Sequence, residues 1–87
     1  MTAEAERIRS MLADMVAEAS DGEVSAEQAL TSGHSLSALG LGSLGLIRLI
    51  DAIEDTFDVC LDLGAEMPSF DRFDSLASHL AGLLAAR

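Results

Sequence analysis

Ser43 is the residue of this sequence whose type and position best suit it to carry a chemical group. It lies in the run LGLGSL (residues 39–44), where a glycine-rich stretch gives way to an amphipathic helical pattern. We therefore expect its hydroxyl at the exposed start of a helix, where backbone N–H groups lack intrahelical partners and the helix dipole is positive. A phosphoryl group on or near the serine oxygen is stabilised by both features. A helix start of this kind suits a phosphate ester.

The two histidines and the single cysteine indicate no catalytic or metal-binding residues. Their spacing does not match a metal site, and no carboxylate or nucleophile stands at an informative distance from either histidine. His34 is expected in a loop and His79 on a helix, in solvent-facing or structural roles. Cys60, between Val59 and Leu61, is expected to be a buried small hydrophobic residue, with a catalytic thiol as the weaker alternative.

Length and composition predict one acidic domain spanning residues 1–87. An apolar fraction of 49% is too high for a disordered chain, despite a net charge of -10. Fifteen Asp and Glu against five Arg repel nucleic acid and anionic lipid and favour partners with basic surfaces. There is no apolar stretch of membrane-spanning length and no secretory signal pattern. We therefore expect a cytoplasmic monomer without nucleic-acid or membrane partners.

Hydrophobic periodicity predicts three main helices. The first runs from about Thr2, as N-cap, to Ser20 and stops at Asp21-Gly22; the second runs from Ser43 to Phe57; the last starts with Asp74 as N-cap. Each carries one apolar stripe at helical spacing, which needs a partner to cover it. The stripes are Ile8, Leu12, Met15, Val16 and Ala19; Leu46, Leu49, Ile50, Ile53 and Phe57; and Leu76, Ala77, Leu80, Leu83 and Leu84.

The connections between these helices differ in length. Ser25 and Gln28 have the spacing of a capping box, which predicts a brief helical turn through Leu30 inside the long link between the first two main helices. After Pro68 and Ser69, residues 70–73 predict one short helical turn whose two phenylalanines cover the end of the bundle. The expected fold is all-α, a small four-helix bundle of three main helices and one short helix, with a long loop between the first and second.

The outward face of the second main helix is expected to bind proteins. Leu44 and Ile47 lie away from the apolar stripe of that helix, so they should be at least partly exposed. An apolar centre with a charged rim is typical of a transient protein interface. The alternative is that both residues pack under the preceding loop. The charged residues of the predicted docking surface are Arg48, Asp51, Glu54 and Asp55.

The sequence resembles the acyl and peptidyl carrier proteins of fatty-acid, polyketide and nonribosomal peptide synthesis over nearly its whole length. The resemblance rests on the run LSALGLGSL (residues 36–44), followed by Leu49, Ile53-Glu54 and Phe57-Asp58-Val59. It implies the acyl-carrier bundle, with Ser43 esterified to 4'-phosphopantetheine by a phosphopantetheinyl transferase that uses coenzyme A and Mg²⁺. The thiol of that arm would carry an acyl or aminoacyl group as a thioester.

A second serine and one departure from the family pattern bear on this assignment. The run GHSL, which contains Ser35, is similar to the GGHSL run of peptidyl carriers. A helix starting there would include Gly40, Gly42 and Gly45, each at a cost of about 1 kcal/mol, so we expect Ser35 to be a loop residue or local cap. Gly42 replaces the aspartate usual before the modified serine, which should loosen the helix start by about 0.5 to 1 kcal/mol. Which transferase accepts the chain, and whether Gly42 restricts modification, stays open.

The resemblance is strongest to a free-standing acyl carrier protein of specialised metabolism, including antibiotic biosynthesis. Residues 54–59 look more like acyl than peptidyl carriers, whereas Arg48 lies on a face that is often acidic in fatty-acid carriers. The implied partners are the transferase, an acyl- or aminoacyl-loading enzyme, ketosynthase or condensation-type enzymes, and a thioesterase or acyltransferase. The chain itself is expected not to be an enzyme. Two alternatives stay open: an aminoacyl carrier of nonribosomal peptide synthesis, and an unmodified helical protein-interaction module.

Overall fold

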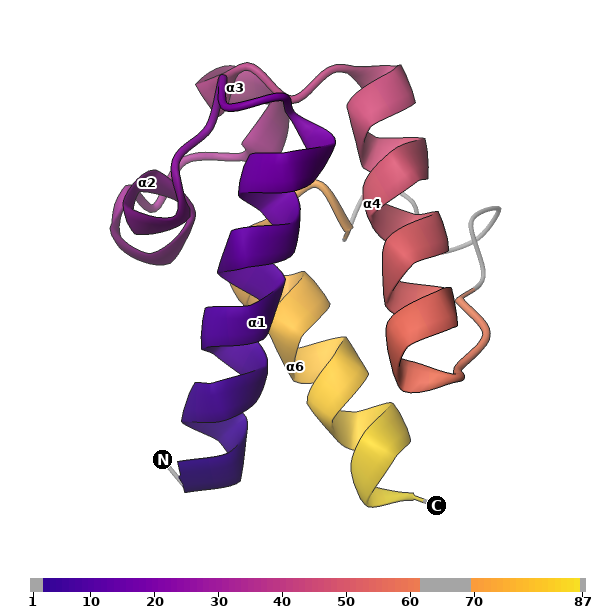
Figure 1. Cartoon of the computed structure of the whole chain (residues 1–87). Coiled ribbons are helices and arrows are strands. Elements are labelled where there is room, and N and C mark those ends of the chain that lie inside the picture. Colours follow the sequence, from indigo (N-terminus) through magenta and orange to yellow (C-terminus); the bar gives the residue numbers. More distant parts are fainter. Residues whose placement is uncertain (1–2, 62–69, 87) are drawn as a thin grey trace.

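The described part of the chain folds into helices that pack around one apolar core. The computed structural model describes residues 3–61 and 70–86, and within these ranges it contains helices and no strand. Figure 1 shows α1 and α4 side by side and antiparallel, with α6 crossing beside α1 and the shorter α2 and α3 in the link between α1 and α4. The all-α carrier-type bundle predicted from the sequence is confirmed. The helices are α1 (Ala3–Ala19), α2 (Ala26–Thr31), α3 (Leu36–Leu39), α4 (Ser43–Phe57) and α6 (Phe73–Ala85).

Helix α1 packs its predicted stripe into the core and ends where the sequence indicated. Ile8, Leu12 and Val16 are buried, while Met15 and Ala19 are partly buried against the core. The N–H of Gly22 donates to the carbonyl of Ala17 at 2.9 Å, and Asp21 adopts a left-handed conformation with φ 54°. This is the Schellman arrangement, which turns the chain sharply away from the helix axis. The predicted N-cap, Thr2, lies outside the described residues.

Helix α4 has the predicted bounds, Ser43 to Phe57, and supplies the centre of the core. Its buried side chains are Leu46, Leu49, Ile50 and Ile53, and Phe57 is partly buried. They belong to the same apolar core as the buried faces of α1 and α6, and α4 packs directly against α1. Each fully buried leucine or isoleucine stabilises the fold by about 1.5–3 kcal/mol, which makes this shared core the main support for the position of α4.

The link between α1 and α4 contains two short helices. The capping box predicted at Ser25 is present: its hydroxyl accepts from the N–H of Gln28 at 3.1 Å, and the Gln28 side chain accepts from the N–H of Ser25 at 2.9 Å. Helix α3 was not predicted, because a helix of four residues is too short to show a periodic pattern. It ends at Gly40, whose φ of 119° favours glycine.

The predicted N-cap of the last helix is wrong by two residues. Helix α6 begins at Phe73 with Arg72 as N-cap, and Asp74 lies in its first turn. The reason is tertiary packing: Phe73 is buried, and the guanidinium of Arg9 lies 5.1 Å from the centre of its ring while donating to Asp74 at 2.8 Å. Phe70 is also buried, as expected. Pro68 and Ser69, at the start of the predicted short turn, lie outside the described residues.

Cys60 is exposed, so its prediction as a buried residue is wrong. Helix α4 ends at Phe57, and its C-cap residue, Asp58, takes a left-handed conformation with φ 55°. The chain then turns so that Leu61, instead of Cys60, enters the core, and the N–H of Leu61 donates to the carboxylate of Glu54 at 2.9 Å. A periodic reading of the sequence misses this turn because Asp58 is not a glycine.

Candidate functional site at the start of helix α4

Ser43 is exposed and is the first residue of α4. The first intrahelical hydrogen bond runs from the N–H of Leu46 to the carbonyl of Gly42 at 2.9 Å. The N–H groups of Ser43, Leu44 and Gly45 precede that bond and have no intrahelical acceptor. Three amide donors without an intrahelical acceptor therefore accompany the serine hydroxyl at the positive end of a 15-residue helix.

No side chain caps this helix start. Gly42, the N-cap residue, forms no side-chain hydrogen bond, and a Cβ atom added to it would meet nothing within 4 Å. Within the described residues, no hydrogen bond engages the Ser43 hydroxyl. An exposed hydroxyl, uncapped amides and open space are what a phosphate ester on this serine requires, so the site fits the predicted group.

Ser35, the competing serine, has its oxygen engaged as a cap. The Ser35 hydroxyl accepts from the N–H of Ala38 at 3.1 Å and starts the four-residue helix α3. The prediction of a local cap is confirmed. A helix continuing from Ser35 into α4 is also excluded by Gly40, whose left-handed backbone breaks the helical path.

A close packing contact fixes the first turn of α4. Leu41 is only 2% exposed, and its side chain packs against Gly45. A Cβ atom added to Gly45 would lie 2.5 Å from Cδ1 of Leu41, which is too close for a real contact. The carbonyl of Ala19, at the end of α1, lies 3.5 Å from the same position. Gly45 therefore allows α1 and the residue before the N-cap to approach α4 closely, which sets the position of the segment carrying Ser43.

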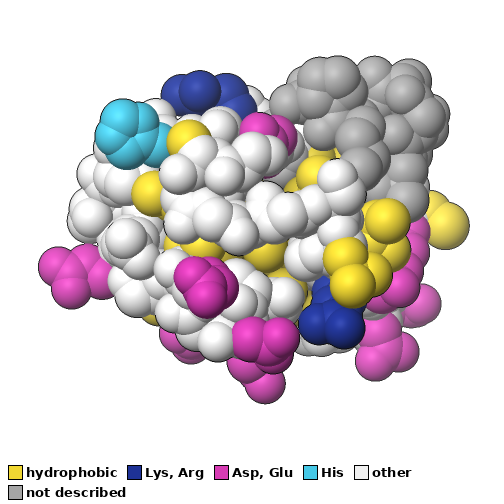
Figure 2. Space-filling model, turned by 90° about the horizontal axis from the view of Figure 1, so that it is seen from above, with side chains coloured by type: hydrophobic (Ala, Val, Ile, Leu, Met, Phe, Trp, Pro, Cys, Tyr) yellow, Lys and Arg dark blue, Asp and Glu magenta, His cyan; other side chains and the backbone are white. Residues whose placement is uncertain are grey.

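The apolar centre of the predicted docking surface lies open to solvent. Leu44 is 61% exposed and Ile47 is 42% exposed, so the alternative in which they pack under the preceding loop is wrong. Figure 2 shows hydrophobic side chains gathered beside a basic side chain, with acidic ones close by, at one edge of the molecule. Leu44 directly follows Ser43, and Ile47 lies four residues after Ser43, one turn further along the same side of α4.

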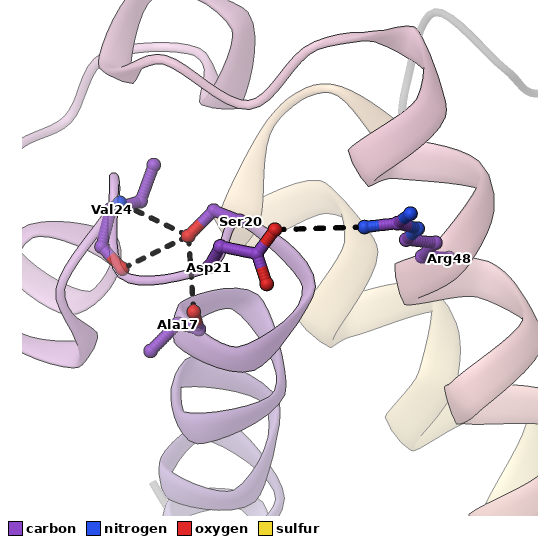
Figure 3. A network of polar contacts seen from close by, with 5 residues as sticks. All are labelled: Ala17, Ser20, Asp21, Val24 and Arg48. Atoms are coloured by element: carbon purple, nitrogen blue, oxygen red, sulfur yellow. Dashed lines mark hydrogen bonds and ion pairs between the residues drawn. The ribbon is translucent and has the colours of Figure 1, made fainter.

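The charged residues predicted around this centre differ in their contacts and in their exposure to solvent. Arg48 points toward the end of α1, where its Nη1 lies 3.7 Å from Oδ2 of Asp21 (Figure 3). Both side chains are largely exposed, so the pair holds the Arg48 charge weakly. Asp51 and Asp55 are exposed, whereas Glu54 is half-buried and accepts the N–H of Leu61. The carboxylate of Glu54 thus has a structural contact that the other two acids lack.

Sequence reasoning missed Asp21 as the neighbour of Arg48. The contact joins the end of α1 to the second turn of α4 and depends on a left-handed residue at Asp21. Beside it, the Ser20 hydroxyl accepts from the N–H of Val24 at 3.0 Å and lies 3.1 Å from the carbonyl of Ala17 (Figure 3). An aspartate directly before a glycine at a helix end is the only sequence signal for this turn.

The described ranges, 3–61 and 70–86, contain neither a candidate metal site nor a candidate membrane-spanning helix. No group of three or more His, Cys, Asp or Glu side chains there could hold a metal ion. No helix there is both long enough and apolar enough to cross a lipid bilayer.

Comparison with known proteins identifies the family. The family described as "Phosphopantetheine attachment site" matches residues 6–80, which is most of the chain. Comparisons with curated proteins and with solved structures gave no match. With the helical bundle and the exposed helix-start serine already described, this match agrees with the resemblance seen in the sequence. The chain belongs to the phosphopantetheine attachment family, whose members are carrier proteins that bear a covalently bound 4'-phosphopantetheine.

Proposed function

We propose that Ser43 is the residue that carries 4'-phosphopantetheine. The observation that carries the proposal is the exposed Ser43 hydroxyl at the uncapped N-terminus of α4. Once the oxygen of Ser43 is esterified, the amides of Leu44 and Gly45 can donate to the phosphate, and the helix dipole favours its negative charge. Ser35 is unsuited to this role because its oxygen already accepts a hydrogen bond.

The protein would serve as an acyl carrier in polyketide, fatty-acid-like or nonribosomal peptide assembly. When bound, the arm supplies a thiol that holds an acyl or aminoacyl group as a thioester. The residues of this chain supply the attachment point and a surface for partner enzymes, and none of them is proposed to catalyse a reaction. Tethering raises the effective concentration of the cargo at each enzyme, and it would do so in the cytoplasm.

The docking surface proposed for these enzymes is centred on Leu44 and Ile47. Both are exposed beside Ser43, so a partner that reaches the serine must cover them. Asp51 and Asp55 add exposed negative charge along the same helix, which attracts basic partner surfaces and speeds encounters at low salt. Arg48 offers a cation that an acidic partner residue could take from its weak contact with Asp21. Glu54 contributes mainly by holding the end of α4.

The partners proposed are those implied by the family resemblance. A phosphopantetheinyl transferase attaches the arm, and an acyl- or aminoacyl-loading enzyme charges it. Ketosynthase or condensation-type enzymes use the cargo, and a thioesterase or acyltransferase releases it. Each must bind briefly, and a small apolar centre of two side chains with exposed charges suits weak, reversible contacts.

Mass spectrometry tests the attachment site. The purified chain is incubated with coenzyme A, Mg²⁺ and a broad-specificity phosphopantetheinyl transferase, and its intact mass is compared with that of Ser43→Ala and Ser35→Ala. We expect the parent chain and Ser35→Ala to gain one phosphopantetheinyl group and Ser43→Ala to gain none. Modification of Ser43→Ala would reject the assigned site. A parent chain that stays unmodified with every transferase tried would favour the unmodified interaction module.

A further inference from the structure

The segment before α6 is tied to α3 by a cluster of hydrogen bonds to Asp71. One carboxylate oxygen, Oδ1, accepts from the backbone N–H of Ser37 at 2.9 Å and from its hydroxyl at 2.7 Å. The backbone carbonyl of Asp71 accepts from the N–H of Leu36 at 2.6 Å. Three donors on two consecutive residues of α3 thus converge on one residue that is distant in sequence.

A fourth bond and two buried side chains support the same contact. The guanidinium of Arg72 donates to the carbonyl of Gly33 at 3.1 Å, just before α3. Leu36 is fully buried on one side of the contact, and Phe70 is 1% exposed on the other. We call the bonds from Asp71 to Leu36 and Ser37 the Asp71 clamp. Because its two sides are anchored in the core, the clamp fixes α3 relative to the start of α6.

The position of α3 is passed on to Ser43 through a short segment. Gly40 closes α3 by donating its N–H to the carbonyls of Leu36 and Ser37. The N–H of Leu41 donates to the same Leu36 carbonyl at 2.9 Å, and its side chain packs against Gly45 in the first turn of α4. Only Gly42 separates Leu41 from Ser43, so a displaced α3 would displace the N-terminal side of the serine.

We infer that Asp71 is a positioning residue for the Ser43 hydroxyl in the transfer of phosphopantetheine. The inference rests on the proposed function, which makes Ser43 the modified residue. Asp71 does not touch the reacting atoms; it holds α3 so that Gly42 and Ser43 present one conformation to the transferase. Hydrogen bonds to a carboxylate are stronger than neutral ones, and these two use the carboxylate itself.

The clamp can open, and this makes its effect measurable. Ser37 is exposed, so water competes for both of its bonds to Asp71. When only a fraction of the carrier holds the conformation that binds, the apparent affinity falls by that fraction. Removing the carboxylate should therefore raise the KM of the transferase for the carrier and leave kcat unchanged, since the serine that reacts is the same.

Transferase kinetics on three variants test the inference. Asp71→Ala removes the acceptor and should raise KM by about threefold or more at unchanged kcat, as expected when the binding conformation becomes a minor state. Asp71→Asn keeps an oxygen acceptor at the same position but accepts weaker, neutral hydrogen bonds, so its KM should lie between those of the parent chain and Asp71→Ala. Ser37→Ala removes the hydroxyl bond to the Asp71 carboxylate and keeps the backbone N–H bond. It should therefore raise KM less than Asp71→Ala does.

Amide hydrogen exchange on the unmodified chain gives a second, independent readout. Asp71→Ala should speed exchange at the N–H groups of Ser37 and Leu41, and Asp71→Asn should speed it less. This measurement needs no transferase, so it reports on the clamp even if Ser43 proves not to be modified. In contrast, modification of Ser43→Ala would defeat the proposed function and leave the exchange result unaffected.

A matched control separates positioning from general loss of stability. Ile8→Val shortens a core residue on α1 that forms none of the hydrogen bonds of the clamp, and Ile→Val changes cost about 0.5–1.5 kcal/mol. It should leave KM and the exchange of the Ser37 N–H close to the parent values. The inference is overturned if Asp71→Ala leaves KM unchanged, if Asp71→Asn behaves like Asp71→Ala, or if Ile8→Val raises KM equally.

Discussion

The missing cap at Gly42 leads to a prediction about stability. Gly42 has φ -79° and ψ 179°, an extended backbone that any residue adopts, and a Cβ atom there meets nothing within 4 Å. An aspartate could therefore enter without moving the chain. Its carboxylate would be placed to accept from the N–H of Leu44 or Gly45, which have no intrahelical acceptor. We predict that Gly42→Asp stabilises the fold.

The size of the effect follows from three contributions. An aspartate cap is better than glycine by a few tenths of a kcal/mol. A negative charge at the positive end of a helix adds about 0.3–1 kcal/mol. Replacing glycine by a residue with less backbone freedom, at a compatible conformation, adds about 0.4–1 kcal/mol through the unfolded state. Repulsion within a chain of net charge -10 offsets part of this, so we expect a net gain of about 1 kcal/mol.

Urea unfolding followed by far-ultraviolet circular dichroism measures this gain as a shift in midpoint at constant slope. Two controls divide the contributions. Gly42→Asn can cap without a charge, and Gly42→Ala restricts the backbone without a cap. The expected order of stability is Asp, then Asn, then Ala, with the difference between Asp and Asn shrinking at high salt. The reasoning is refuted if Gly42→Asp is no more stable than Gly42→Ala.

Three further predictions concern α4. Gly45→Ala should destabilise the fold by about 1–3 kcal/mol in urea unfolding, because the added methyl group meets the buried Leu41 side chain. Alanine is the better helix former, so a stabilised variant would contradict this prediction. Asp51→Lys and Asp55→Lys should each slow association with the transferase at low salt in stopped-flow measurements, with little change in stability; equal rates at all salt concentrations would contradict the docking surface. Glu54→Ala should lower the free energy of unfolding by about 1–3 kcal/mol, because it leaves the part-buried N–H of Leu61 without its acceptor. Asp55→Ala should be nearly neutral, and equal losses in the two variants would argue against the Glu54 contact.

The long helices could be predicted from sequence because each has to bury one face. In α4, apolar residues recur at helical spacing from Leu46 to Phe57, and a glycine-rich stretch precedes Ser43, so both bounds were predicted correctly. The capping box at Ser25 was equally readable, since its two hydrogen bonds depend only on residues three steps apart. Local chemistry and periodicity were sufficient for these elements.

The misses have tertiary causes. Asp74 looked like an N-cap, but Phe73 is drawn into the core and becomes helical, and Arg9 binds the aspartate from α1. Cys60 looked buried between two apolar neighbours, but the left-handed Asp58 rotates the chain so that the cysteine faces solvent. Neither outcome can be read from neighbouring residues, because each depends on which side chain another helix can accommodate.

The choice between Ser35 and Ser43 shows how far spacing could identify the site. Three glycines disfavour a helix that starts at Ser35, but Gly45 lies inside α4 itself, so only Gly40 and Gly42 distinguish the two serines. The structure supplies a stronger difference. Both serines stand at helix starts, but Ser35 is itself the cap, and its oxygen accepts a backbone N–H. The N-cap residue of α4 is Gly42, which has no side chain, and Ser43 is the next residue. Ser35 occupies the cap position of α3, so its hydroxyl is engaged, whereas Ser43 lies one residue after the cap position of α4. The Ser43 hydroxyl is therefore available beside amides that lack an intrahelical acceptor, and for this reason we propose the phosphate ester on Ser43.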